Sequence, residues 1–213
     1  MAGVKLVLGF FATLALAGAA HAAELRVAAL PPAQDLSLPF WCDWGYDWDE
    51  RCYTDASARL SVGGVDDKVW RAALRFSLDP IPAGAAIVTA ELTLAYDRTC
   101  VAPGRRFRPC DGRGFDLVGR PIFSSQWLHE REVEYGPVIA YAQLEPAAPP
   151  GQVVFDITDL VADWHAAGLA NDGILVSLSE EQEDFGSSGP AFPSSRYQDP
   201  SLRPRLVVWY LPD

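Results

Sequence analysis

The sequence is poor in basic residues, in histidine and in long apolar runs. Its 213 residues include 17 lysines and arginines against 28 aspartates and glutamates, which gives a formal net charge of −11. A chain this acidic is not expected to bind nucleic acid. After the N-terminal region no apolar run approaches the roughly 20 residues that a transmembrane helix needs. We therefore expect no nucleic-acid partner and no membrane insertion of the exported chain.

The sequence also lacks the short motifs of common enzyme classes. It contains no G-x-S-x-G, H-E-x-x-H, P-loop or dinucleotide-binding pattern. Glycoside hydrolysis needs two carboxylates at a set separation, and the candidates are Asp156, Asp159, Asp163 and His165. Asp156 and Asp159 are also explained as residues at the start of a helix, beside Thr158. We expect a non-catalytic protein, with a glycan-active enzyme as a further alternative.

Residues 1–22 have the features of a secretory signal peptide. Lys5 precedes an apolar run of roughly 13 residues, and Ala20-His21-Ala22 matches an A-x-A cleavage signal. Residues 23–213 would then form a single domain, since about 190 residues suit one β-sandwich. The expected destination of the exported chain is the periplasm or the extracellular space.

All four cysteines lie in the part expected to be exported, where an even number indicates disulfide bonds. They are Cys42, Cys52, Cys100 and Cys110. Three connectivities are possible, and we expect Cys42–Cys52 and Cys100–Cys110 because short loops close at a low entropic cost. A zinc site is disfavoured, since such sites more often have C-x-x-C spacing with further ligands.

Most of the chain shows the patterns of short β-strands. Apolar residues alternate with period two in 71–78 and 88–96, and a corner rich in proline joins the two segments. Further strands are expected at 25–30, 59–62, 115–120, 138–144, 153–157, 174–179 and 205–211. Eight or nine short strands with proline and glycine corners predict an all-β fold, an antiparallel β-sandwich, most simply a jelly roll.

One short helix is expected near 158–167. Thr158 is the predicted N-cap, and Asp159 suits the positive end of the helix dipole. Gly168 is expected to help end the helix. Trp164 lies on the apolar face with Leu160, and we expect it to pack in the core while the helix closes one end of the sandwich.

Residues 40–53 form the segment richest in aromatic and acidic residues. An aromatic ring covers the C–H face of a pyranose while carboxylates bind its hydroxyls, which suggests a carbohydrate site. The stacking candidates are Trp41, Trp44, Tyr46 and Trp48. The alternative is that these rings pack over the mouth of the sandwich. Three acids of the same segment, Asp43, Asp47 and Asp49, are candidate ligands for a structural calcium ion, although no EF-hand pattern is present.

Five arginines gather around the second pair of cysteines. They are Arg98, Arg105, Arg106, Arg108 and Arg113. Guanidinium groups bind carboxylates in a bidentate manner, so an acidic polysaccharide is a candidate ligand here. Balancing the charge of acidic loops is the alternative explanation. Residues 180–184 form one such acidic run, which we expect to be a solvated loop.

Three blocks of residues together resemble a known family. They are 71–78 with its continuation through 81–84 and 90–96, then 155–161, and finally 202–210. This pattern resembles the DNRLRE-type domains and related carbohydrate-binding modules of secreted bacterial proteins. The resemblance implies a jelly-roll accessory module, and some relatives bind polysaccharides such as alginate. Arg196 and Tyr197 stand where the family pattern more often has an acid.

The sequence therefore favours a secreted, non-catalytic β-sandwich module that binds a polysaccharide or another glycan through its aromatic segment. The alternative is a structural or adhesive protein of the cell envelope that binds another protein. No cofactor is expected apart from a possible structural calcium ion.

Overall fold

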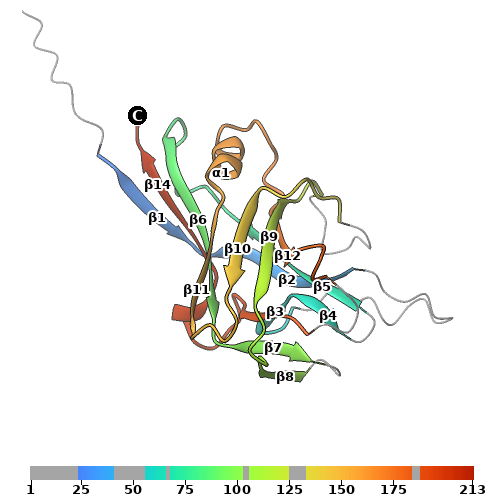
Figure 1. Ribbon diagram of the computed structural model, residues 1–213. Coiled ribbons are helices and arrows are strands. Elements are labelled where there is room, and N and C mark those ends of the chain that lie inside the picture. The colour runs from blue at the N-terminus through green and yellow to red at the C-terminus, as the bar shows by residue number, and fades with distance from the viewer. Residues whose placement is uncertain (1–23, 41–55, 66–67, 103–105, 125–132, 184–187) are drawn as a thin grey trace, which may run out of the picture.

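The computed structural model of the protein describes residues 24–40, 56–65, 68–102, 106–124, 133–183 and 188–213. Figure 1 shows two antiparallel sheets packed against each other, with one short helix at the upper end of the molecule. The predicted all-β sandwich is confirmed.

The first sheet contains four strands in the order β1 (Arg26–Leu30), β14 (Arg205–Leu211), β6 (Ala86–Tyr96) and β11 (Gly151–Asp156). The second contains β10 (Ala140–Leu144), β9 (Phe115–Pro121), β12 (Ile174–Leu178), β5 (Lys68–Phe76) and β2 (Pro32–Phe40), and β4 (Gly63–Val65) also pairs with β5. Two short pairs join β3 (Arg59–Ser61) to β13 (Ala191–Pro193), and β7 (Thr99–Ala102) to β8 (Arg106–Pro109). The chain crosses repeatedly between the two main sheets, as in a jelly roll.

The main core lies between the two sheets. Its side chains come from alternate positions of the strands, because successive residues of a strand point to opposite faces. The most fully buried include Leu74, Phe76, Leu92, Leu94, Leu117, Phe155, Val176, Leu206 and Val208. Each such side chain contributes about 1.5–3 kcal/mol when it leaves water, so this alternation accounts for most of the driving force for the fold.

The second sheet is buried on both faces. Ala73 and Leu175 form a smaller cluster with Ile122 and Val133 on the face turned away from the main core. The prediction that 71–78 is a half-buried strand was therefore wrong, since Arg71 is only 6% exposed and Ala73 is fully buried. The segment that follows β9 covers this face, which the strand pattern alone does not reveal.

Strand β2 was not predicted because it contains Pro32 and Pro39. Proline lacks the N–H group that a central strand needs, and it is tolerated where a strand has one free side. β2 lies at the end of the order in the second sheet and pairs only with β5. It still contributes the buried side chains of Leu36 and Leu38.

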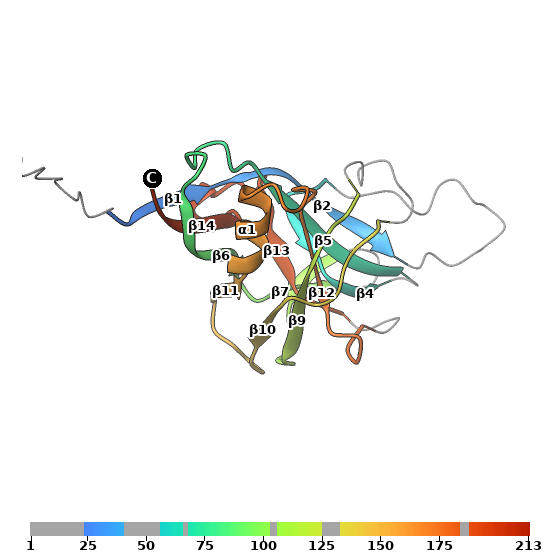
Figure 2. The same ribbon diagram turned by 90° about the horizontal axis from the view of Figure 1, so that it is seen from above.

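Helix α1 (Thr158–His165) lies between the two sheets in both Figure 1 and Figure 2. It packs on β6 and buries Leu160, Val161 and Trp164, so the predicted core position of Trp164 is confirmed. In the part of the chain that the structure describes, no helix is long and apolar enough to cross a membrane.

The predicted N-cap of this helix was wrong. Ile157 occupies the N-cap position, and Thr158 is the first helical residue. The hydroxyl of Thr158 accepts a 3.0 Å hydrogen bond from the Ala90 N–H and donates one to Asp156. Asp156 also accepts the Thr158 N–H at 3.0 Å. Asp156 therefore binds the free helix N–H, because the threonine hydroxyl is engaged with strand β6.

Candidate functional site

The predicted aromatic carbohydrate site lies outside the described residues. This applies to its stacking candidates, to its calcium ligands and to the first pair of cysteines, namely Trp41, Trp44, Tyr46, Trp48, Asp43, Asp47, Asp49, Cys42 and Cys52. These assignments stay predictions. Arg105 also lies outside the described residues, whereas the second disulfide and the other arginines around it are described.

The disulfide between Cys100 and Cys110 is confirmed, with an S–S distance of 2.06 Å. It joins the start of the β7–β8 hairpin to the residue that follows it. The hairpin is also fixed to its surroundings by backbone bonds, since the Cys110 N–H donates to the Arg98 carbonyl and the Val101 N–H donates to Gly189, both at 2.9 Å. The disulfide and these backbone hydrogen bonds thus fix the position of strand β8, which carries Phe107 and Arg108.

A cleft opens beside this hairpin, whose strands lie at the lower end of the molecule in Figure 1. It has a volume of about 540 Å³. Its lining comes from β3, from the β6–β7 corner and from β8, and consists of Arg59, Asp97, Arg98, Thr99, Phe107, Arg108 and Pro109. We call it the arginine cleft, because three arginines and one aspartate give it a positive charge in a chain of net charge −11.

One arginine of the cleft is held in place by several partners. Arg59 donates two hydrogen bonds to the Asp97 carboxylate, at 3.1 and 2.6 Å, and a third to the Tyr197 hydroxyl at 3.1 Å. Its guanidinium also lies over the rings of Tyr197 and Phe107, at 4.9 and 5.7 Å from their centroids. These contacts hold the Arg59 guanidinium in one position on one side of the cleft. Its charge is largely neutralised by Asp97.

Burial alone would raise the pKa of Asp97. Hydrogen bonds from Arg59 and Thr99, together with the charge of Arg59, outweigh burial and hold the pKa of Asp97 below its ordinary value. Asp97 therefore stays ionised at neutral pH and binds Arg59 rather than a ligand.

The other two arginines of the cleft are exposed and available. Among the described residues, no carboxylate forms an ion pair with Arg98 or Arg108, whereas Arg113 pairs with Asp111 at 3.0 Å. Phe107 stands between them in sequence on β8, and its side chain is 42% exposed. Charge balancing therefore explains Arg113. It does not explain Arg98 and Arg108, which line the cleft together with Phe107, or the exposed Arg106, which is not part of the lining.

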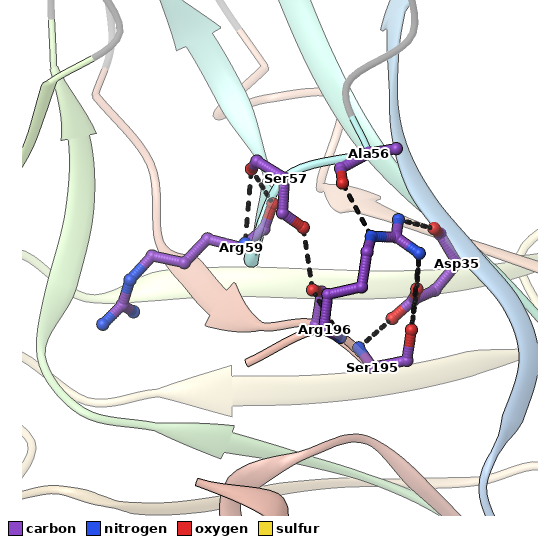
Figure 3. A network of polar contacts seen from close by, with 7 residues as sticks. Asp35, Ala56, Ser57, Arg59, Ser195 and Arg196 are labelled. Atoms are coloured by element: carbon purple, nitrogen blue, oxygen red, sulfur yellow. Dashed lines mark hydrogen bonds and ion pairs between the residues drawn. The ribbon is translucent and has the colours of Figure 1, made fainter. Parts of the chain in front are cut away.

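A polar network joins Asp35, Ser195 and Arg196 close to Arg59 (Figure 3). Asp35 on β2 is 1% exposed, and its carboxylate accepts hydrogen bonds from the Ser195 N–H at 2.5 Å and the Ser195 hydroxyl at 2.6 Å. Arg196 forms an ion pair with the same carboxylate at 3.3 Å and donates to the Ala56 carbonyl at 2.6 Å. The network ties the chain before β3 to the chain after β13.

Its neighbours continue these ties towards the cleft. The Ser194 hydroxyl donates to the Ser57 carbonyl at 2.8 Å, and Ser57 exchanges hydrogen bonds with the backbone of Arg59. The side chain of Arg59 points away from this network in Figure 3. Arg196 therefore belongs to a network that reaches the backbone of Arg59 through Ser194 and Ser57.

The acidic run at 180–184 is not simply a solvated loop. Glu183 forms a bidentate ion pair with Arg71, at 2.8 and 2.5 Å, and its side chain is only 9% exposed. Glu180 pairs with Arg120 at 2.8 Å, and the guanidinium groups of both arginines lie over the ring of Tyr135. The expectation was therefore wrong for Glu183, which neutralises a buried arginine.

The candidate hydrolytic acids lie around helix α1, at the end of the sandwich away from the cleft. Asp156, Asp159 and Asp163 are exposed, and His165 is half-buried. Hydrogen bonds from Thr158 hold the pKa of Asp156 below its ordinary value. A depressed pKa suits a residue that caps a helix and opposes a role as general acid.

Within the described ranges, no three His, Cys, Asp or Glu side chains gather in a way that could hold a metal ion. Compared with known protein families and with curated proteins, the chain matches none of them. The resemblance to carbohydrate-binding modules therefore stays a prediction.

The pairing of Arg59 with Asp97 was missed by sequence reasoning. The two residues are 38 positions apart, and neither belongs to a recognisable motif. The only signal was the group of arginines around Cys100 and Cys110, which marked the right region without its aspartate or its aromatic walls.

Proposed function

We propose that the protein is a secreted, non-catalytic β-sandwich module that binds carbohydrate, and that the arginine cleft takes an acidic polysaccharide. The observation that carries the proposal is that Arg98, Arg108 and the exposed Phe107 line one cleft, and that no described carboxylate forms an ion pair with either of these two arginines. Guanidinium forks bind carboxylates, and an aromatic ring covers the apolar face of a sugar.

The electrostatics favour an acidic ligand over a neutral one. The overall negative charge of the chain repels polyanions at long range, yet this repulsion is screened beyond about 8–10 Å at physiological salt. Within that distance a carboxylated sugar meets Arg98 and Arg108, with the only carboxylate of the lining, Asp97, already bound to Arg59. The cleft is therefore selective through local charge.

The test is a binding screen of residues 23–213 against acidic and neutral polysaccharides by isothermal titration calorimetry. We expect an acidic polysaccharide to bind, Arg98→Ala and Arg108→Ala to weaken binding about tenfold each, and Phe107→Ala to weaken it by a similar factor. Arg26→Ala is the matched control, since Arg26 is exposed on β1 and is not part of the cleft lining. Equal loss in the control would contradict the assignment of the cleft.

The predicted aromatic segment provides a second arm of the same screen. Trp44→Ala and Trp48→Ala, measured with and without calcium, ask whether the carbohydrate site extends to residues 41–48. Loss of binding in these variants but not in Arg108→Ala would move the site away from the cleft.

A protein partner is the second candidate function, and the outer face of the first sheet favours it. Two aliphatic side chains there are exposed, Val27 by 57% on β1 and Val154 by 42% on β11. Exposed apolar side chains on a sheet face offer contacts to a protein partner. Failure of every polysaccharide to bind, together with capture of an envelope protein that Val27→Asp abolishes, would support this alternative.

A further inference from the structure

A second, smaller hollow is lined by the last residue of β6, which directly precedes the arginine-cleft residues Asp97 and Arg98 in the chain. It has a volume of about 310 Å³. It is formed where the link between β10 and β11 passes the end of β6, and its lining includes Tyr96, Gln143, Glu145, Pro149, Pro150 and Gln152. We call it the link hollow. It sits at the open edge of the sandwich, because β10 and β11 are edge strands of the two sheets.

The linings of the two hollows are consecutive in the chain at the corner between β6 and β7. Tyr96 lines the link hollow, and the next two residues, Asp97 and Arg98, line the arginine cleft. The charge of Arg98 reaches the Tyr96 hydroxyl, whose pKa it lowers against the larger effect of burial, which raises it. Since residues two apart in the chain lie within about 7 Å of each other, one oligosaccharide can reach from Arg98 to Tyr96 in the lining of the link hollow.

The chemistry of the link hollow differs from that of the cleft. Its one charged side chain is Glu145, which is exposed, and no described residue bonds to its carboxylate. Gln152 is exposed as well, and Gln143 is held by a 2.9 Å hydrogen bond to Asp116. The prolines of the link present apolar rings. Carboxylate and amide groups beside apolar rings suit the hydroxyls and C–H face of a neutral sugar, and the negative charge opposes a uronate.

We infer that the link hollow is a second carbohydrate subsite, which takes a neutral sugar unit next to an acidic unit in the arginine cleft. This inference rests on the proposed function and deepens it, because it makes the ligand a mixed polymer with acidic and neutral units. Glu145 accepts hydrogen bonds from sugar hydroxyls, and Gln152 is the second hydrogen-bonding group.

The test compares two tetrasaccharides by calorimetry. An oligogalacturonate carries a carboxylate on every unit, and a hyaluronan fragment alternates glucuronate with neutral N-acetylglucosamine. We expect Glu145→Gln to weaken binding of the hyaluronan fragment about tenfold, since a hydrogen bond to a charged acceptor is lost. The same substitution should strengthen binding of oligogalacturonate, since a like charge is removed. Gln152→Ala should weaken only the hyaluronan fragment.

Asp163→Asn is the matched control. Asp163 is an exposed acid on helix α1, so its substitution should not change the affinity for either tetrasaccharide. If Arg108→Ala weakens binding of both tetrasaccharides while Glu145→Gln changes the affinity for neither, the arginine cleft is supported as a binding site and the second subsite is refuted. If Glu145→Gln changes the affinity for both tetrasaccharides in the same direction, the link hollow does not select a neutral sugar unit. If neither probe binds, the proposed function fails together with the inference.

Discussion

Asp35→Asn tests whether the network behind the cleft stabilises the fold. The substitution preserves shape but removes the charge and turns one carboxylate oxygen into an N–H donor. The Asp35 carboxylate accepts from two groups of Ser195 and pairs with Arg196, and asparagine cannot accept from all three. One donor of Ser195 is therefore left unsatisfied at a site that is 1% exposed.

The expected cost follows from these contacts. Losing a hydrogen bond to a buried charged group costs about 1.5–3 kcal/mol. The ion pair with Arg196, whose side chain is 44% exposed, adds less than about 1 kcal/mol because solvent screens it. We expect Asp35→Asn to lower the free energy of unfolding by about 3 kcal/mol, and the melting temperature of a domain this size by about 9 °C.

The assay is urea denaturation at neutral pH under oxidising conditions, followed by tryptophan fluorescence. Arg196→Ala should cost about 1 kcal/mol, because it leaves the bonds to Ser195 intact. Asp163→Asn, an exposed acid near the end of α1, should change stability by less than about 0.5 kcal/mol. A loss below about 1 kcal/mol for Asp35→Asn would refute the claim that the network holds β2 to the β13 end.

Three other predictions concern the end of helix α1, the Cys100–Cys110 disulfide and Asp97 in the arginine cleft. Ala167→Gly should raise the free energy of unfolding by about 1 kcal/mol, because Ala167 has a left-handed φ of 57° that glycine adopts without strain. Replacing Cys100 and Cys110 together by serine should lower the free energy of unfolding by about 3 kcal/mol, since the unfolded chain without the cross-link gains conformational entropy. The pKa of Asp97 is depressed by Arg59, so the stability it contributes is present above the unfolded aspartate pKa of about 3.9 and should be lost as pH falls below it.

Each of these has its control. Ala166→Gly, one residue earlier and with φ of −74°, should destabilise the protein, and equal effects at 166 and 167 would contradict the strain argument. Dithiothreitol should reproduce the double cysteine variant in the wild type and change nothing in the variant itself. Asp97→Asn should flatten the acid limb of the stability curve, and an unchanged limb would contradict the assigned role of Arg59.

The sequence predicted those elements that depend on local pattern. The alternation in β6 and β14, the apolar face of α1 and the local Cys100–Cys110 bond all follow from residues close together in the chain. The elements that were missed depend on the sheet as a whole. β2 forms despite two prolines because it is an edge strand, and the extra burial of Arg71 depends on a covering segment and on Glu183, far away in sequence.

The candidate site shows the same division. The group of arginines was visible in the sequence, but which of them are free was not, since that depends on where the acids fall. Asp97 and Asp111 neutralise Arg59 and Arg113, while Arg98 keeps its charge open to solvent. The link hollow gave no sequence signal, because its polar groups come from two strands and a proline-rich link that look like ordinary surface.

The most direct test of the account is the affinity of residues 23–213 for oligogalacturonate, compared with that of the Arg98→Ala, Arg108→Ala double variant at low and physiological salt. We predict that the wild type binds, that salt weakens its binding, and that the folded double variant loses binding at both salt concentrations. Binding of equal strength and salt dependence in the wild type and the double variant would contradict the assignment of the arginine cleft as the acidic-polysaccharide site.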